Sequence, residues 1–283
     1  MRIFLAGATG AVGRLLLPLL VQAGHDVAGM TRNAAKAYKI EALGGRPVVA
    51  NAFEREALFD VLHSERPDVV IHQLTDLSVR DFAGNSRLRI EGTCNLVDAA
   101  RAVGVHRMIA QSISWMYEPG QNPAYEDEPL DLDAPDARGH AVAAVQSLEQ
   151  AVAEMPIGTV LRYGLFYGPA TWYSRDGLTS EQIQRGEVEA TDGITSFVHV
   201  ADAAQAALQA LDWPAGPVNI VDDVPAKGTE WVTEYARLIG ASAPPIKPGA
   251  AAWERGATNV KARRLGWRPR YANWREGFRA ELG

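Results

Sequence analysis

Gly7, Gly10 and Gly13 are the residues of this chain whose spacing points most directly to a chemical role. They follow a short apolar run at 2–6 and precede an apolar segment that begins at Arg14. Glycines in such a strand, turn and helix allow a tight turn, close approach of a pyrophosphate to the backbone, and an anion at the helix amino end. The segment predicts a dinucleotide-binding turn. Its predicted contacts are Gly7, Ala8, Thr9, Gly10, Ala11, Val12 and Gly13.

The residues after the strand expected at 26–30 indicate which dinucleotide binds. A preference for NAD usually comes from an acidic residue that ends this strand and accepts hydrogen bonds from the ribose hydroxyls. Here Asp26 opens the strand, and Thr31 and Arg32 follow it. A guanidinium beside a hydroxyl suits a 2′-phosphate through charge-assisted hydrogen bonds. The pattern therefore favours NADP(H) over NAD(H).

Alternating strand and helix patterns place this turn in a larger fold. Strands are expected at 2–6, 26–30, 47–50, 68–73, 106–112 and 157–163, and helices at 11–23, 33–43, 54–64, 86–103 and 137–154. A helix at 177–185, a strand at 195–200, a helix at 201–211, a strand at 217–221 and a helix around 229–239 follow. Apolar strands separated by helices are typical of a parallel sheet covered on both faces. The sequence predicts a Rossmann-type doubly wound α/β fold.

The later part of the chain is less regular and rich in tryptophan. Because aromatic side chains shape apolar cavities, we expect a small substrate-binding lid region at 166–194 and 226–283. The dinucleotide-binding domain is expected at 1–165, with 195–225 returning to it.

Composition limits the class of partner. Over 283 residues the formal net charge is −6, with charges of both signs dispersed along the chain. This distribution argues against a nucleic-acid surface or an anionic membrane as partner. With no signal peptide and no apolar run near the ~18 residues of a membrane span, we expect a cytoplasmic protein with a small-molecule substrate. No metal-ligand spacing is present, and the single cysteine, Cys94, is expected in the core.

Six ordered segments resemble the atypical and extended short-chain dehydrogenases/reductases, specifically the NAD-dependent epimerase/dehydratase family. They are Gly7–Gly13, Asp68-Val-Val-Ile-His72, Glu91-Gly-Thr-Cys-Asn-Leu-Val-Asp-Ala-Ala100, Leu161-Arg-Tyr-Gly-Leu-Phe-Tyr-Gly-Pro169, Phe197-Val-His-Val-Ala-Asp-Ala-Ala204 and Asn259-Val-Lys-Ala-Arg-Arg-Leu-Gly-Trp267. The resemblance spans nearly the whole chain. It implies further cofactor contacts at Gln73, Leu74 and Tyr163, and it implies that the helices at 86–103 and 137–154 pair in a homodimer.

The family's usual proton-transfer residues have no counterpart in this chain. The resemblance implies a Tyr-x-x-x-Lys pair on the helix at 137–154, in which the lysine lowers the tyrosine pKa. An alignment through Glu149 places Ala141 and Val145 at these two positions. Neither side chain exchanges a proton.

Three residues are candidates to replace the missing pair. Ser114 follows the strand at 106–112 and could orient a substrate oxygen, His140 precedes the vacant tyrosine position, and Tyr117 could donate a proton. Each also has an ordinary structural explanation: a polar strand end, a surface histidine or a packed tyrosine. The substrate-binding residues are expected to be Ser112, Trp115, Tyr167, Trp172 and Tyr173.

These features favour an NADP(H)-dependent oxidoreductase that reduces a small, rather apolar carbonyl, enone or iminium substrate by hydride transfer. A bound nicotinamide supplies the hydride chemistry itself. Two alternatives stay open. One is a non-redox cyclase, isomerase or lyase on the same fold, and the other is a regulatory protein that senses NADP(H).

Overall fold

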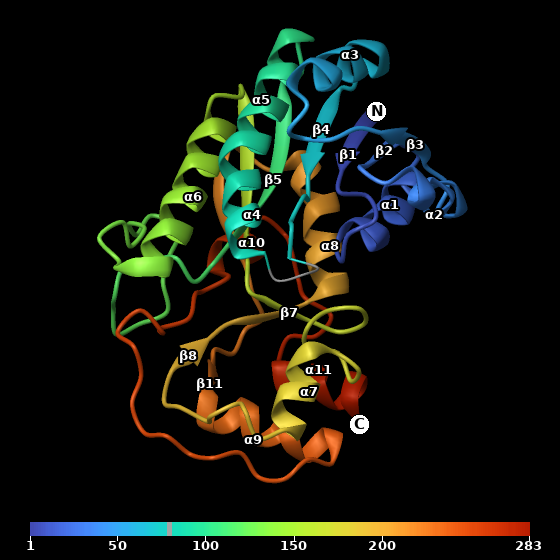
Figure 1. Ribbon diagram of the computed structural model, residues 1–283. Helices are drawn as coiled ribbons and strands as arrows, with labels where there is room; N and C mark the ends of the chain where they lie inside the picture. Colours follow the sequence, from blue (N-terminus) through green and yellow to red (C-terminus); the bar gives the residue numbers. More distant parts are fainter. Residues whose placement is uncertain (78–80) are drawn as a thin grey trace. The chain divides into compact units, whose positions relative to one another are not determined.

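A computed structural model describes residues 1–77 and 81–283 (Figure 1). Its seven-stranded sheet has the strand order β10-β6-β5-β4-β1-β2-β3. The strands are β1 (Arg2–Ala6), β2 (Asp26–Thr31), β3 (Arg46–Val49), β4 (Val69–His72), β5 (Arg107–Ile113), β6 (Ile157–Tyr163) and β10 (Gly216–Ile220). β1 pairs in parallel with both β2 and β4, β2 with β3, and β4 with β5. Strand order reverses at β1, so the predicted doubly wound α/β fold is confirmed.

The chain forms two compact units. The first unit comprises Met1–Ser112, Leu132–Leu161 and Ala204–Pro217, and the second comprises Ile113–Asp131, Arg162–Ala203 and Val218–Gly283. The predicted dinucleotide-binding domain and substrate-binding region are defined by function, and contacts between residues do not test function. Both therefore stay predictions. Among the described residues, none of the helices has both the length and the apolarity that crossing a bilayer requires.

The first unit carries most of the helices that flank the sheet. They are α1 (Gly13–Gln22), η1 (Ala34–Lys36), α2 (Ala37–Ala42), α3 (Arg55–Glu65), α4 (Phe82–Arg87), η2 (Leu88–Gly92), α5 (Thr93–Ala102), α6 (Asp136–Ala153) and η3 (Ala210–Asp212), while α8 (Val200–Gln209) belongs partly to each unit. Helix α5 contacts both α3 and α6 (Figure 1). The core is formed where strand residues such as Phe4 and Val70 pack against helix residues such as Leu62 and Leu96.

The second unit has its own core and two small sheets. Strand β7 (Leu165–Tyr167) pairs in parallel with β9 (Phe197–His199), and β8 (Ile194–Thr195) pairs antiparallel with β11 (Ala226–Lys227). Its helices are α7 (Leu178–Gln184), α9 (Gly228–Ile239), α10 (Val260–Arg264) and α11 (Trp274–Leu282). Helix α9 contacts both α7 and α11. Aromatic rings dominate the core, and Tyr167 packs edge-on against Phe197 and Phe278.

Several details differ from the sequence predictions. The single helix expected at 86–103 is divided by η2, a π-helical turn, and the strand expected at 195–200 is broken at Ser196, whose hydroxyl accepts the N–H of Ala257 at 2.9 Å. Cys94 is exposed on α5, so its expected place in the core was wrong. Helices α10 and α11 lie in the part of the chain for which no helix was predicted.

Candidate active site

The glycine turn leaves no room for side chains. Gly7 has a φ of +90°, and a Cβ at this position would lie 2.6 Å from the carbonyl oxygen of Gln73. A Cβ on Gly13 would lie 2.1 Å from the carbonyl oxygen of Gly7. Both positions therefore require glycine, one for its φ and for space and the other for space alone.

Helix α1 begins directly after this turn, and no acidic residue competes with an anion at its amino end. No side chain caps its first turn, and the first turn contains no acidic residue. The amino end of a helix carries partial positive charge, which suits a phosphate.

Gln73, which follows β4, places an amide beside the same turn. Its side chain is buried, and neither its amide oxygen nor its amide nitrogen has a partner among the described residues. The neighbouring Leu74 donates its N–H to Nδ1 of His72 at 3.2 Å, and its carbonyl accepts from Gln111 at 2.9 Å. Because buried amides are normally hydrogen-bonded, the unsatisfied Gln73 amide and the close glycine turn fit a bound dinucleotide.

Arg32 is held by an acidic residue that the sequence analysis did not identify. Its two terminal nitrogens donate to the carboxylate of Asp76 at 2.9 and 3.2 Å. These hydrogen bonds raise the pKa of Arg32. The side chain of Arg32 is 61% exposed, whereas that of Asp76 is 16% exposed, so the guanidinium remains accessible to a ligand. The hydroxyl of Thr31 is engaged locally with the backbone of Asn33.

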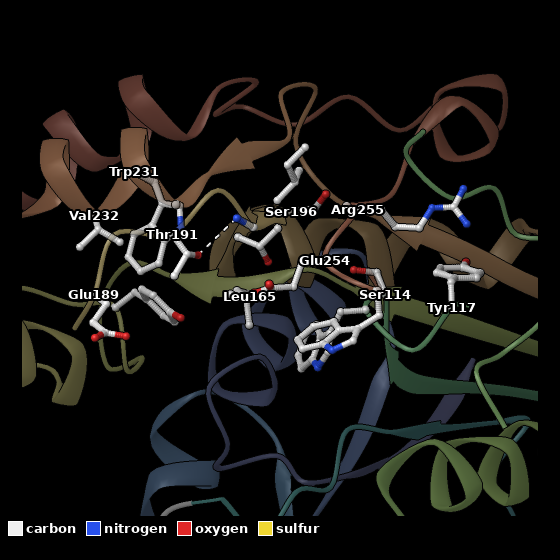
Figure 2. A pocket seen from close by; sticks show the side chains of 18 residues that line it. Ser114, Tyr117, Leu165, Glu189, Thr191, Ser196, Trp231, Val232, Glu254 and Arg255 are labelled. Atoms are coloured by element: carbon white, nitrogen blue, oxygen red, sulfur yellow. Dashed lines mark hydrogen bonds between the residues drawn. The ribbon is translucent and has the colours of Figure 1, made fainter. Parts of the chain in front are cut away.

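The second unit contains a cavity of about 350 Å³ (Figure 2). Aromatic residues and hydroxyl groups dominate its lining, and two glutamates and one arginine supply its charged groups. The lining consists of Ser114, Trp115, Tyr117, Leu165, Tyr173, Glu189, Thr191, Gly193, Ile194, Thr195, Ser196, Gly228, Trp231, Val232, Trp253, Glu254, Arg255 and Gly256. A cavity of this size accommodates a small aromatic molecule.

Of the proposed catalytic residues, Ser114 and Tyr117 line this cavity and His140 does not. The hydroxyl of Ser114 has no hydrogen-bond partner among the described residues, and the residue is held by its N–H, which donates to the carbonyl of Tyr163 at 2.9 Å. The hydroxyl of Tyr117 donates to Asn219 at 2.6 Å and accepts from Arg162 at 2.8 Å. Burial raises the pKa of Tyr117 to about 12. His140 is exposed on α6 in the first unit.

The remaining predicted residues fall into two groups. Trp115 and Tyr173 line the cavity, and burial raises the pKa of Tyr173. Ser112, Tyr163, Tyr167 and Trp172 are not part of its lining. The hydroxyl of Ser112 donates to Glu149 at 2.8 Å, and that of Tyr163 donates weakly to the carbonyl of Ala203 at 3.5 Å.

Sequence reasoning missed the charged side of the cavity. Glu189 and Glu254 come from separate segments of the second unit and form no motif along the chain. The only available signal was the density of tryptophan after residue 225, which predicted an aromatic region but not its carboxylates.

Residues 3–221 match the model of the family described as "NAD dependent epimerase/dehydratase family". A 3-diazoavenalumate denitrifying reductase from a Streptomyces species is 43% identical, over 99% of this chain and 100% of that protein. A 4-hydroxy-2-methyl-3-oxo-4-farnesyl-3,4-dihydroquinoline-1-oxide ketoreductase from Stigmatella aurantiaca is 30% identical, over 79% of this chain and 68% of that protein.

Solved structures agree in fold. The UDP-glucose 4-epimerase of Thermus thermophilus, in complex with NAD, has a TM-score of 0.80 at 23% identity and covers 100% of this chain and 98% of its own. The UDP-glucuronic acid 4-epimerase of Bacillus cereus, in complex with UDP-glucuronic acid and NAD, has a TM-score of 0.78 at 20% identity. The match covers 100% of this chain and 98% of that chain. At these identities the likeness concerns the fold alone.

Proposed function

The chain belongs to the NAD-dependent epimerase/dehydratase family and is an enzyme of the oxidoreductase type, and from this membership we propose a reductase that transfers hydride without transferring a proton. In this proposal the glycine turn binds NADPH and the cavity of the second unit binds the acceptor. The acceptor is a small aromatic molecule that carries a diazonium group.

The observation that carries this proposal is the composition of α6. Residues 136–153 contain neither tyrosine nor lysine, and Val145, at the position aligned with the family's lysine, is fully buried. A carbonyl acceptor needs a proton on oxygen as hydride reaches carbon, and a positioned acid contributes roughly 10²- to 10⁴-fold to such a step. An acceptor that needs no proton removes that requirement.

A diazonium group meets this condition. Hydride from NADPH forms the new C–H bond, the C–N bond breaks, and its electron pair leaves with neutral N₂, so that NADP⁺ and the arene are the other products. No proton enters or leaves. The 43% identical relative is named as a denitrifying reductase of a diazo compound, which supports this substrate class.

NADP(H) as the preferred cofactor belongs to the same proposal. Arg32 carries an accessible guanidinium after β2, and Asp26 lies at the opposite end of that strand. The family is described by its use of NAD, and the solved complexes contain NAD, so the choice of NADP(H) rests on Arg32 and Asp26.

Isotope labelling tests the proposal. Purified protein is mixed with a carboxyphenyl diazonium salt and NADPH deuterated at the transferred position, and the arene is analysed by mass spectrometry. We expect deuterium on the ring carbon from the cofactor and none from D₂O. The Gly7→Ala variant supplies the blank for the non-enzymatic reaction. Turnover no faster than this blank, together with reduction of a neutral ketone or enone, would overturn the diazonium assignment.

A further inference from the structure

We infer that the carboxylate of Glu254 makes the cavity of the second unit selective for an aromatic cation. This inference rests on the proposed function, because it explains how the acceptor is recognised, but it concerns binding and is testable without turnover. Figure 2 shows Glu254 at the cavity lining between Leu165 and Ser114.

Of the charged residues that line the cavity, Glu254 is the one whose charge no ion pair neutralises among the described residues. Glu189 forms an ion pair with Lys247 at 2.8 Å. Arg255, which is 8% exposed, pairs with Glu128 at 2.7 Å and also donates to the carbonyls of Asn122 and Glu118. No lysine, arginine or histidine of residues 1–77 and 81–283 forms an ion pair with Glu254, although this residue lines the same cavity. The cavity is therefore electrostatically suited to a ligand of positive charge.

Backbone contacts fix the position of this carboxylate. One oxygen of Glu254 accepts the N–H of Ala251 at 2.7 Å, and the carbonyl of Glu254 accepts the N–H of Ile194 at 3.1 Å. The side chain lies over Gly193, where an added Cβ would be 2.6 Å from both carboxylate oxygens. The missing side chain at Gly193 thus provides the space that the carboxylate occupies.

Aromatic rings in the cavity also contribute to recognition of the cation. Trp115, Trp231 and Trp253 line the cavity with Tyr173. Trp231 is held edge-on by Tyr173, with ring centroids 5.7 Å apart, and by Phe197 at 5.4 Å. Ring faces attract cations, and tryptophan does so most strongly. A planar cation fits this combination of indoles and one carboxylate better than a neutral molecule of the same shape.

Binding of a non-reactive probe tests the inference. Dissociation constants of phenyltrimethylammonium and of its neutral isostere tert-butylbenzene are measured by ligand-observed NMR. We expect the unmodified protein to prefer the cation by about tenfold, equivalent to about 1.4 kcal/mol. Glu254→Gln should abolish the preference, because glutamine keeps an oxygen for the Ala251 N–H but carries no charge. Glu254→Asp should retain part of it.

Two control variants separate charge from folding. Glu187→Gln removes an exposed carboxylate outside the cavity and should leave both dissociation constants unchanged. Gly193→Ala should weaken cation binding without removing a charge, because its methyl group displaces the Glu254 carboxylate. Melting temperatures establish that each variant is folded.

The outcomes for binding and for catalysis are distinguishable. If the unmodified protein shows no preference for the cation, or if Glu254→Gln keeps it, the inference is wrong, whether or not diazonium reduction occurs. If the preference depends on Glu254 but the labelled assay gives no arene, the inference holds and the proposed reaction is wrong.

Discussion

The glycine turn is built from backbone, whereas the cavity of the second unit is built from side chains. In the turn, Gly7 and Gly13 lie so close to neighbouring carbonyls that one methyl group would overlap them. In the cavity, rings and carboxylates from several loops and short elements surround open space. We therefore expect substitutions in the turn to act in an all-or-none manner and substitutions in the cavity to change affinity by degrees.

The strongest test of this contrast is Gly7→Ala against Gly104→Ala. Both glycines have positive φ, +90° and +77°, but a Cβ on Gly104 would meet nothing within 4 Å. The left-handed backbone alone costs about 1–2 kcal/mol for alanine. Gly7→Ala should in addition weaken NADPH binding roughly 100-fold or more, because the methyl group overlaps the Gln73 carbonyl. Calorimetric titration and thermal melts measure both effects, and equal losses in the two variants would contradict the steric explanation.

The buried histidine beside the turn predicts acid sensitivity. Burial lowers the pKa of His72 from 6.5 to about 4, and its Nδ1 accepts the N–H of Leu74, so protonation would set two N–H groups against each other. The folded state therefore favours the neutral form of His72. Its contribution to stability is therefore complete above pH 6.5 and is lost as the pH falls from 6.5 towards about 4. The loss is on the order of 3 kcal/mol.

The variant His72→Gln isolates this contribution. Its amide oxygen still accepts a hydrogen bond but does not titrate, so its unfolding free energy should change less between about pH 7 and about pH 5. Urea denaturation of both proteins at the two pH values measures the difference. An equal loss of unfolding free energy in both proteins would show that a group other than His72 causes the acid sensitivity.

Cofactor choice should respond to the Arg32–Asp76 pair by a smaller factor. Arg32→Asp should shift the ratio of NADPH to NADH affinity towards NADH by about tenfold, because a phosphate loses a charge-assisted partner and meets a carboxylate. Asp76→Asn should shift the ratio in the opposite direction, because it releases the guanidinium and removes a negative charge. The control is Arg55→Asp, which disrupts another exposed pair of the first unit, with Asp98 at 2.9 Å. Fluorescence titration gives the ratios, and no change in Arg32→Asp would exclude Arg32 from phosphate recognition.

The smallest expected effect is at Ser114. Ser114→Ala removes one neutral hydrogen bond from the Ser114 hydroxyl to the bound acceptor, which costs about 0.5–1.5 kcal/mol. The variant should therefore slow turnover roughly three- to tenfold and leave NADPH affinity unchanged. His140→Ala should change neither quantity, since His140 is exposed and does not line the cavity. Steady-state rates across the pH range check both variants. Loss of activity in His140→Ala would make histidine a proton donor and would contradict a hydride transfer without a proton.

The same contrast explains what the sequence could reveal. Glycine requirements and apolar strands are local, so the turn at 7–13 and the strand that precedes it were predictable from neighbouring residues. Glu254 and Trp231 line one cavity although they lie in different segments, and no periodicity in the sequence indicates this arrangement. The π-helical turn at Leu88–Gly92 was also hidden, because the surrounding apolar pattern fits a continuous helix. Roles of Ser114, Tyr117 and His140 stay predictions.

The core of the second unit is completed by residues that are synthesised after the rest of the unit. Trp267, Trp274, Phe278 and Leu282 are fully buried, and the carboxylate of Asp202 accepts the N–H groups of Arg270 and Tyr271 at 2.8 and 3.0 Å. The first unit has all of its segments once Pro217 has been synthesised. On the ribosome the first unit should therefore fold earlier, while the aromatic segments of the second unit wait for α11. A premature stop that removes α11 would leave those rings exposed to proteases and to aggregation, even though every residue of the glycine turn and the cavity lining had been made.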